Sequence, residues 1–365
     1  MSSHTRGRIA CLNGTKNVEL KEFDVPSPDP DAIVTEIVRA NVCGSELHMW
    51  RGGHPHINDG PLGHEGLCRI VDLGENVTTD NAGRPVEEGD LIVPTYFAIC
   101  EACPRCGAGE FRLCEHAYDY WSQSADTHPH FHGTFASHYY VYPEQFFYKV
   151  SPDVPEGPAA SANCALAQVL GGLDKAEVGW GDTVVVQGAG GLGLNAVAAA
   201  TERGAETIVI DGVADRLDLA ERFGADHTVD LRTYDSVEER ADRVRELTDG
   251  QGADVGVEVA GVPEAFAEGI ELLRPGGRYL EMGNVIPGHT TEFDPGAMTR
   301  KSINVVSVMR YDPWYLRTAL DFLRETADDY PFDELVGEGF ALDDVDAAIR
   351  RSDERDVARA SLVPE

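Results

Sequence analysis

Val184-Val185-Val186-Gln187-Gly188-Ala189-Gly190-Gly191-Leu192-Gly193 joins an apolar run to a glycine-rich turn and a helix-forming segment. A G-x-G-x-x-G pattern between a strand and a helix is typical of dinucleotide binding. Gly188 permits the tight turn, Gly190 lets the backbone approach a pyrophosphate, and Gly193 allows close packing of helix and strand. Gly191 and Leu192 open the helix, whose N-terminal N–H groups can bind phosphate. The alternative is a glycine turn that packs without binding.

Beyond this stretch, strand patterns alternate with helix patterns. We expect strands at residues 184–187, 207–210, 254–259 and 277–282, and helices at 192–203 and 215–223. This alternation predicts parallel strands joined by crossover helices, which form a doubly wound α/β sheet.

Asp211 ends the 207–210 strand, about twenty residues after the glycine pattern. An acid at this place accepts hydrogen bonds from the adenosine ribose and repels a 2′-phosphate. The sequence therefore favours NAD over NADP as the cofactor. Arg216 keeps NADP open as the alternative, because a nearby arginine can attract that phosphate.

The first part of the chain has the character of an all-β domain. Strand patterns cover residues 34–40, 67–73, 91–93, 135–141 and 146–150, with a turn-rich segment at 79–85. This pattern predicts a small β-barrel. Helices are expected at 159–176, 313–326 and 342–351.

Four cysteines form a closely spaced group, Cys100-x-x-Cys103-x-x-Cys106-x7-Cys114. Four thiolates at short spacing can close a tetrahedron around zinc and leave no open position, so this zinc would be structural. An iron–sulfur cluster uses related spacings and stays open as an alternative, as does coincidence.

A second group of possible zinc donors lies upstream, in Cys43-Gly-Ser-Glu-Leu-His48 and Gly63-His64-Glu65. A catalytic zinc has three protein ligands and an open position, so Cys43 and His64 require a third ligand. Taken alone, they are equally well a buried thiol and an ordinary histidine.

In order along the chain, these motifs, with Gly133-Thr-Phe-Ala136, resemble those of the zinc-dependent medium-chain alcohol dehydrogenase family. The resemblance covers nearly the whole length. It implies a GroES-like β-barrel catalytic domain over residues 1–165, with a structural zinc lobe at 97–116. It further implies a Rossmann NAD-binding domain over 166–309, a return to the catalytic domain over 310–365, and an active site between the two domains. The family's common assemblies imply a homodimer or homotetramer.

The resemblance also implies roles for single residues. Cys164 falls at the third ligand position of the catalytic zinc, giving two Zn²⁺ per chain. Ser45 and His48 match the family's proton relay, with an ordinary surface histidine as the alternative for His48. Glu65 directly follows a ligand and could either act as a charge behind the zinc or bind the zinc transiently. Glu46 departs from the family, which usually has aspartate there to support the ligating histidine, so its geometry is an open point.

The resulting expectation is a zinc-dependent oxidoreductase that transfers hydride from an alcohol to NAD(P), giving an aldehyde or ketone. A polyol or sugar dehydrogenase of the same family is the nearest alternative. A zinc-free reductase of the superfamily is less favoured, because such enzymes lack the ligand set found here. A catalytically silent protein that binds zinc and a dinucleotide is kept as an alternative from a different functional class.

Two further features bear on the substrate. His128, His130 and His132 alternate and could bind a metal, although a loop at the pocket edge is the favoured interpretation. Aromatic pocket walls are expected from residues nearby or upstream, namely Tyr120, Trp121, Phe131 and Trp50.

The composition excludes several classes of partner. The 365 residues carry 63 acidic and 30 basic side chains, for a net charge of −33, and the lysines are scattered. We therefore expect neither nucleic acid nor an anionic membrane as a partner. The spread acidity suggests a salt-adapted source. With no signal-peptide core and no apolar run long enough for a bilayer, a cytoplasmic location is expected.

Overall fold

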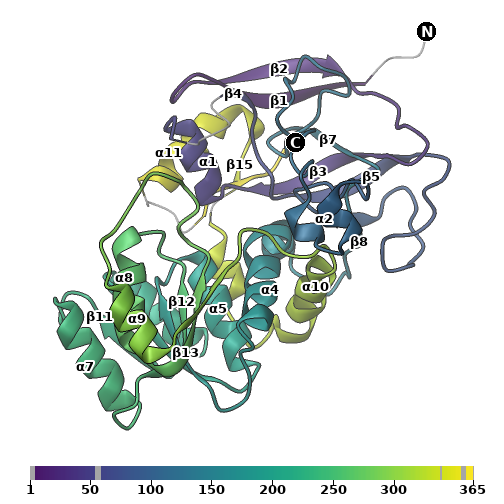
Figure 1. Cartoon of the computed structure of the whole chain (residues 1–365). Coiled ribbons are helices and arrows are strands. Elements are labelled where there is room, and N and C mark those ends of the chain that lie inside the picture. Colours follow the sequence, from purple (N-terminus) through teal and green to yellow (C-terminus); the bar gives the residue numbers. More distant parts are fainter. Residues whose placement is uncertain (1–4, 54–58, 338, 355–358, 365) are drawn as a thin grey trace. The chain divides into compact units, whose positions relative to one another are not determined.

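In the computed structural model, the chain forms two compact units (Figure 1). The described residues are 5–53, 59–337, 339–354 and 359–364. The β unit comprises residues 1–164, 312–328 and 332–365, and the α/β unit comprises 165–311 and 329–331. The C-terminal part of the chain thus belongs mainly to the same unit as the N-terminal part.

The α/β unit contains a six-stranded sheet in the order β11-β10-β9-β12-β13-β14. The neighbouring strands pair in parallel. Their bounds are β9 Thr183–Gln187, β10 Glu206–Asp211, β11 His227–Asp230, β12 Ala253–Glu258, β13 Leu273–Glu281 and β14 Asn304–Ser307. The strand order reverses between β9 and β12, which is the topological switch point where such sheets bind ligands. The predicted doubly wound sheet is confirmed.

Helices cover this sheet, as the sequence pattern requires. Val184, Val185 and Val186 of β9 are fully buried, because a central parallel strand has both faces covered. The helices of the unit are α4 Ala167–Lys175, α5 Gly191–Thr201, α6 Ala214–Arg222, α7 Val237–Leu247, α8 Pro263–Leu272 and α9 Pro295–Lys301. The alanines at 196 and 198–200 let α5 pack closely on the sheet.

The β unit is built from two sheets. The three-stranded sheet has the order β2-β1-β4, and the seven-stranded sheet runs β15-β16-β3-β5-β6-β8, with β7 paired to β3. Their bounds are β1 Arg6–Asn13, β2 Val18–Asp24, β3 Ile33–Asn41, β4 Asp59–Pro61, β5 Leu67–Leu73, β6 Leu91–Pro94, β7 His138–Val141, β8 Phe147–Lys149, β15 Gly339–Phe340 and β16 Ser361–Leu362. The strand predicted at 135–141 starts only at His138, because Ala136 bridges to Ile9 of β1.

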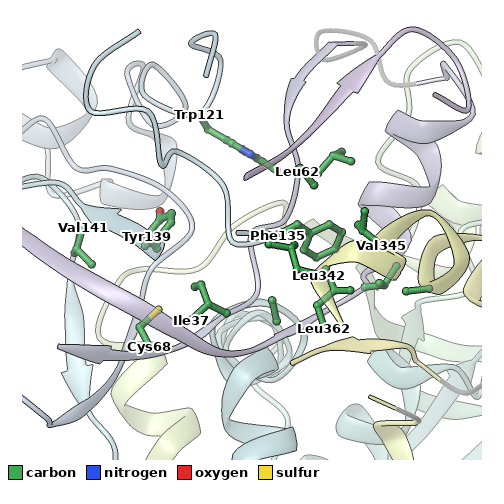
Figure 2. Packing of buried hydrophobic residues seen from close by; sticks show 14 of the residues in the cluster. Ile37, Leu62, Cys68, Trp121, Phe135, Tyr139, Val141, Leu342, Val345 and Leu362 are labelled. Atoms are coloured by element: carbon green, nitrogen blue, oxygen red, sulfur yellow. The ribbon is translucent and has the colours of Figure 1, made fainter. Parts of the chain in front are cut away.

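The C-terminal segment supplies part of the core of the β unit. It contains α10 Tyr315–Thr326, two 3₁₀ turns, Phe332–Leu335 and Leu342–Asp344, and α11 Val345–Asp353. Leu342, Val345 and Leu362 are buried in one cluster with Ile37 and Phe135 (Figure 2). Each such side chain contributes roughly 1.5–3 kcal/mol by leaving water, so this segment is integral to the unit.

Near the candidate site, one helix differs from the prediction and another was not predicted. The helix expected at 159–176 is divided into α3 Glu156–Ser161, a π-helical turn Ala162–Leu166, and α4. The stretch after Cys43, for which no helix or strand was predicted, forms α1 Gly44–Trp50. Short and irregular helices of this kind depend on tertiary contacts and leave a weak periodic signal. Among the described residues, no helix is long and apolar enough to cross a membrane.

Candidate metal centre and nucleotide-binding turn

The segment that carries His64 and Glu65 is fixed by neighbouring backbone. Gly63 has φ +88°, a conformation that favours glycine. Thr134 bonds this segment twice, through its N–H to the Gly63 carbonyl at 3.0 Å and through its hydroxyl to the Glu65 carbonyl at 2.8 Å. The Asn163 amide donates to the His64 carbonyl at 2.9 Å. The π-helical turn thereby brings its own Cys164 to the histidine.

Helix α1 presents the other predicted residues. Cys43 is its N-cap residue, and its backbone N–H donates to the Glu46 carboxylate at 2.9 Å. Ser45 Oγ lies 3.9 Å from Cys43 Sγ. Ser45 and His48 are three residues apart on the helix and therefore share one side of it. Both predicted relay residues are half-buried.

The predicted zinc donors come together in the β unit. One donor atom each from Cys43, His64, Glu65 and Cys164 lies within 4.8 Å of the others. The two Sγ atoms are 3.9 Å apart, and His64 Nε2 is 3.3 Å from Cys164 Sγ. Thiolates of one tetrahedral zinc are about 3.8 Å apart when the Zn–S distance is 2.3 Å. The donor set and its spacing therefore fit zinc.

Glu46 fixes the orientation of the His64 ring. Its Oε1 lies 2.5 Å from His64 Nδ1, and both side chains are buried. Because Nδ1 faces the carboxylate, Nε2 is the ring nitrogen turned toward Cys164. The longer side chain found here in place of the family's aspartate therefore reaches the histidine.

The hydrogen bond between Cys43 and Cys164 shifts the pKa values of the two thiols in opposite directions. A hydrogen bond from Cys164 lowers the pKa of Cys43 well below its usual value, and the same bond raises the pKa of Cys164. The arrangement thus already favours one thiolate, the form that binds metal.

Arg359 is a residue of the site that the sequence analysis missed. Its Nη1 donates to both Glu65 oxygens, at 2.9 and 2.7 Å. Burial raises the pKa of Glu65, and the guanidinium opposes that rise. Glu65 itself is fully buried, so this ion pair neutralises a charge next to the candidate metal donors. No local motif marks Arg359, which lies 294 residues from its partner.

The aromatic surroundings of His64 include Trp121, one of the expected wall residues, and Tyr96, which was not predicted. Trp121 lies 5.5 Å from the imidazole between ring centroids, and Tyr96 packs edge-on at 5.3 Å. Tyr118 contacts both of these rings. Trp50 and Tyr120 belong to the same buried core cluster as Trp121, and the expected wall residues also make other contacts. Phe131 packs in a separate core cluster and Trp50 lies under the cations of Lys16 and Arg350, while the Tyr120 hydroxyl accepts a bond from Gln145.

Two of the three alternating histidines form structural hydrogen bonds, and His128 contacts the His130 ring edge-on. His132 is buried, with Nε2 at 3.0 Å from the Thr127 carbonyl and Nδ1 at 2.6 Å from the Tyr142 hydroxyl. His130 bonds the Ala125 carbonyl through Nδ1 and stacks on Phe23. Across the part of the chain that the structure describes, the groups of side chains able to hold a metal do not include these histidines.

The four-cysteine lobe has the form of a second metal site. The Sγ atoms of Cys100, Cys103, Cys106 and Cys114 lie within 4.8 Å of one another, and those of Cys100 and Cys106 are 3.9 Å apart. Cys103 caps the short helix α2 Pro104–Gly107 and accepts a bond from Cys106 N–H. All eight cysteines of the chain are free thiols, so the lobe is not closed by disulfides. Its donor set also fits zinc.

The glycine turn of the α/β unit has the shape that a dinucleotide needs. Gly188 has φ +106°, and a Cβ there would lie 2.9 Å from the Ala260 backbone. A Cβ at Gly193 would collide with the Gly188 carbonyl, whereas one at Gly190 would meet nothing within 4 Å. The turn is therefore tightly packed at Gly188 and Gly193 and open at Gly190, the predicted pyrophosphate position.

Asp211 lies at the end of β10, next to this turn. It accepts hydrogen bonds from Ala189 N–H at 2.7 Å and Val213 N–H at 2.9 Å. Each carboxylate oxygen has a second lone pair that can accept a ribose hydroxyl. Arg216 Nη1 lies 3.9 Å from the carboxylate and is partly exposed.

Comparison with known proteins agrees with the fold and the donor sets. Residues 29–152 match the family model described as alcohol dehydrogenase GroES-like domain, and residues 191–325 match that of zinc-binding dehydrogenase. The chain therefore belongs to the zinc-dependent medium-chain alcohol dehydrogenase family, and the predicted combination of GroES-like and Rossmann folds is confirmed.

Individual relatives support this membership. The chain is 33% identical over 349 residues to 5-exo-hydroxycamphor dehydrogenase of Pseudomonas putida, covering 94% of each chain. It is 31% identical over 320 residues to sorbitol dehydrogenase of Halalkalibacterium halodurans, covering 87% of this chain and 88% of that one. The structure of an alcohol dehydrogenase from Thermotoga maritima superposes with a TM-score of 0.93 at 32% identity, covering 99% of this chain and 100% of that one.

Proposed function

We propose that this protein is a zinc-dependent dehydrogenase that interconverts an alcohol and its aldehyde or ketone with NAD. The observation that carries the proposal is the convergence of Cys43, His64 and Cys164 next to a serine on α1. These three side chains would hold the catalytic zinc, and Cys100, Cys103, Cys106 and Cys114 a second, structural zinc. Bound zinc supplies a Lewis acid that lowers the pKa of a substrate hydroxyl.

The protein's own groups would remove the substrate proton. Ser45 lies beside Cys43, so its hydroxyl is placed to accept that proton first. His48, one turn further along α1, would pass it toward solvent, because the pKa of histidine lies near working pH. Glu65 and Arg359 neutralise each other behind the donors, and Glu46 holds the His64 ring.

The Rossmann unit would bind the cofactor through Gly188, Gly190, Gly191, Leu192 and Gly193. The nicotinamide supplies the hydride acceptor. Asp211 supports NAD over NADP, since its carboxylate would repel a 2′-phosphate. Arg216 lies 3.9 Å from that carboxylate, and the Asp211 charge would weaken its attraction for such a phosphate.

For the substrate we favour a bulky alicyclic or aromatic alcohol over a polyol. Trp121 and Tyr96 pack against His64, so apolar ring surface lies next to the proposed open position. Such a surface leaves the extra hydroxyls of a polyol without partners, which is costly. The dehydrogenase acting on hydroxycamphor, an alicyclic alcohol by its name, is among the relatives.

We further propose a homo-oligomer adapted to a salt-rich cytoplasm. Strand β14 ends the Rossmann sheet with half-buried Val305 and Val306, and an open edge of this kind invites pairing with a second copy. The net charge of −33 is repulsive in dilute buffer and screened in salt. The eight free thiols fit a reducing compartment. Light scattering, and unfolding in dilute buffer against molar KCl, test the first two points.

The function is tested with primary, secondary, cyclic and polyol alcohols and both NAD and NADP, at low and high salt, by the absorbance of reduced nicotinamide. We expect turnover with NAD and the highest kcat/KM for cyclic secondary alcohols. Trp121→Leu should reduce the difference in kcat/KM between cyclic and other alcohols. The control Trp314→Leu replaces the exposed N-cap residue of α10 and should leave this difference unchanged.

Inactivity across the whole panel would contradict the dehydrogenase and favour the silent binder. Metal analysis distinguishes the dehydrogenase from the silent binder without depending on the activity measurement. Two zinc ions per chain, one of them exchangeable, are expected of the enzyme. A single zinc that does not exchange is expected of a silent binder.

A further inference from the structure

Two buried carboxyl groups lie at the carboxyl edge of the Rossmann sheet and are not explained by the proposed chemistry. Glu258 is the last residue of β12 and Glu281 the last residue of β13, the neighbouring parallel strand. Glu258 is fully buried, and Glu281 is half-buried with its Oε2 atom inaccessible to solvent. Two carboxylates in contact at such a place are unfavourable unless a proton lies between them.

The Glu258 carboxylate accepts hydrogen bonds from both turns that follow β12 and β13. Its Oε1 accepts from Gly261 N–H at 2.7 Å, and its Oε2 accepts from Gly283 N–H at 3.1 Å. A Cβ on Gly283 would lie 2.5 Å from Glu258 Oε2 and 2.7 Å from the Gly261 nitrogen. The two turns therefore touch each other around this one carboxylate.

Asn284 joins the second carboxyl group to the first. Its side-chain amide donates to Glu258 at 3.0 Å and to Glu281 at 3.2 Å, and its backbone N–H donates to Glu281 at 3.1 Å. Within the described chain, no donor reaches Glu281 Oε2. A proton held between the two carboxyl groups would provide the donor that this buried oxygen lacks.

These turns flank the proposed cofactor site. Ala260, in the turn after β12, packs under Gly188, and the sheet reverses its strand order between β9 and β12. Ligands of doubly wound sheets bind outside the carboxyl ends of the strands at this reversal. A second negative charge in the pair would repel a diphosphate and push the two turns apart.

The titratable groups near Glu258 and Glu281 are held in a fixed charge state by their own partners or by burial. The carboxyl pair is therefore the group expected to change its charge. Tyr279 on β13 donates its hydroxyl to Gln187 of β9, and the burial of that hydroxyl raises its pKa. Glu268 on α8 is paired with Arg240 of α7 at 2.7 Å. Burial, followed by the contact with Glu281, raises the pKa of Glu258 to about 8.

We propose that Glu258 and Glu281 are positioning residues that share one proton, and that this proton is required for tight dinucleotide binding. The inference rests on the proposed nucleotide-binding function. Below the titration range the pair carries one charge and holds the two turns together. As pH rises through about 8, the proton is lost and binding weakens.

The test is the dissociation constant of NADH, measured by fluorescence on the full-length, zinc-loaded protein at constant salt from pH 6.5 to 9. For one proton lost near pH 8, we expect the constant to rise about tenfold between pH 7 and 9. Glu281→Gln leaves only the Glu258 carboxylate, to which the new amide can donate a hydrogen bond. The dissociation constant of NADH for this variant should therefore not change with pH. Glu281→Met, with no second carboxyl group, should be level as well if the glutamine variant does not fold.

Glu264→Gln is the matched control, since it removes an exposed carboxylate from the same unit. It should follow the wild-type curve. A level wild-type curve, or a Glu281→Gln curve parallel to the wild type, would overturn the inference and leave the proposed function intact. Absence of NADH binding at every pH would overturn both.

Discussion

Glu46 Oε1 lies 2.5 Å from His64 Nδ1, while Oε2 of the same carboxylate accepts the N–H of Cys43 at 2.9 Å. One side chain therefore orients a proposed imidazole ligand and caps the helix that begins at a proposed thiolate ligand. Because Glu46 is fully buried, it has few alternative conformations. The arrangement makes the metal site depend on a residue that would not touch the metal.

Replacement of Glu46 by glutamine should weaken zinc binding at this site by about 10–100-fold, as for other groups that orient a ligand histidine. The amide has one acceptor oxygen for two N–H donors, so either the ring or the helix cap loses its partner. Chelator competition on the purified protein measures the affinity. Glu75→Gln removes an exposed acid of the same unit and should have no effect. Equal affinities for both variants would contradict the role of Glu46.

Ser45→Ala should lower kcat by about 10²–10⁴-fold, the usual range for loss of a proton-transfer group. Zinc content should stay at the wild-type level, because the hydroxyl lies beside Cys43 without being one of the proposed donors. Steady-state kinetics and metal analysis are made on the same preparation. Ser122→Ala, at an exposed serine, is the control. Unchanged turnover would remove Ser45 from the relay.

Cys106→Ser should remove one of two zinc ions and lower the thermal midpoint by more than about 5 °C. The lobe contains only the four-residue helix α2 and a single 3₁₀ turn, so bound metal would supply much of its folding energy. Metal analysis and calorimetry follow the two effects. Cys11→Ala changes a buried thiol outside both donor groups and should retain two zinc ions. Loss of zinc from neither variant would exclude a metal in the lobe.

His132 should make the protein sensitive to acid. Burial lowers its pKa to about 4 from an ordinary value of 6.5, so the unfolded chain binds the proton more readily. Stability is therefore lost as pH falls from about 6.5 toward 4. Between pH 6.5 and 4.5, the wild type should lose about 2 kcal/mol more unfolding free energy than His132→Asn.

Denaturant unfolding at the two pH values measures this difference for His132. His116→Asn is the control, because His116 is exposed and its pKa is raised by the hydrogen bond to Asp119. A variant at position 132 that loses as much stability as the wild type would show that His132 already binds a proton when folded.

Asp211→Ser should raise the ratio of kcat/KM for NADP over NAD by at least about tenfold, corresponding to 1.4 kcal/mol. The variant removes the charge that would repel a 2′-phosphate and leaves Arg216 able to attract it. Kinetics with both cofactors give the ratio. Asp215→Ser, at the exposed first turn of α6, should leave it unchanged. A ratio unmoved by Asp211→Ser would indicate that another group selects the cofactor.

Features that depend on short-range chemistry could be predicted from the sequence alone. Gly188 to Gly193 need little beyond their own spacing to form a strand–turn–helix, and the four cysteines of the lobe lie within fifteen residues. The alternation of strands and helices likewise predicted the doubly wound sheet, since each element carries its own periodicity. The motif order was sufficient to identify the family.

Relationships between residues far apart in the sequence became evident only in the folded chain. Arg359 meets Glu65 across 294 residues, and Glu258 meets Glu281 across two strands, with no local pattern that marks either pair. The rings beside His64 are Trp121, which was expected, and Tyr96, which was not, whereas Phe131 packs in a separate core cluster. Such contacts depend on how whole sheets and helices pack against each other. The local sequence around a buried residue therefore does not predict which distant residue it contacts.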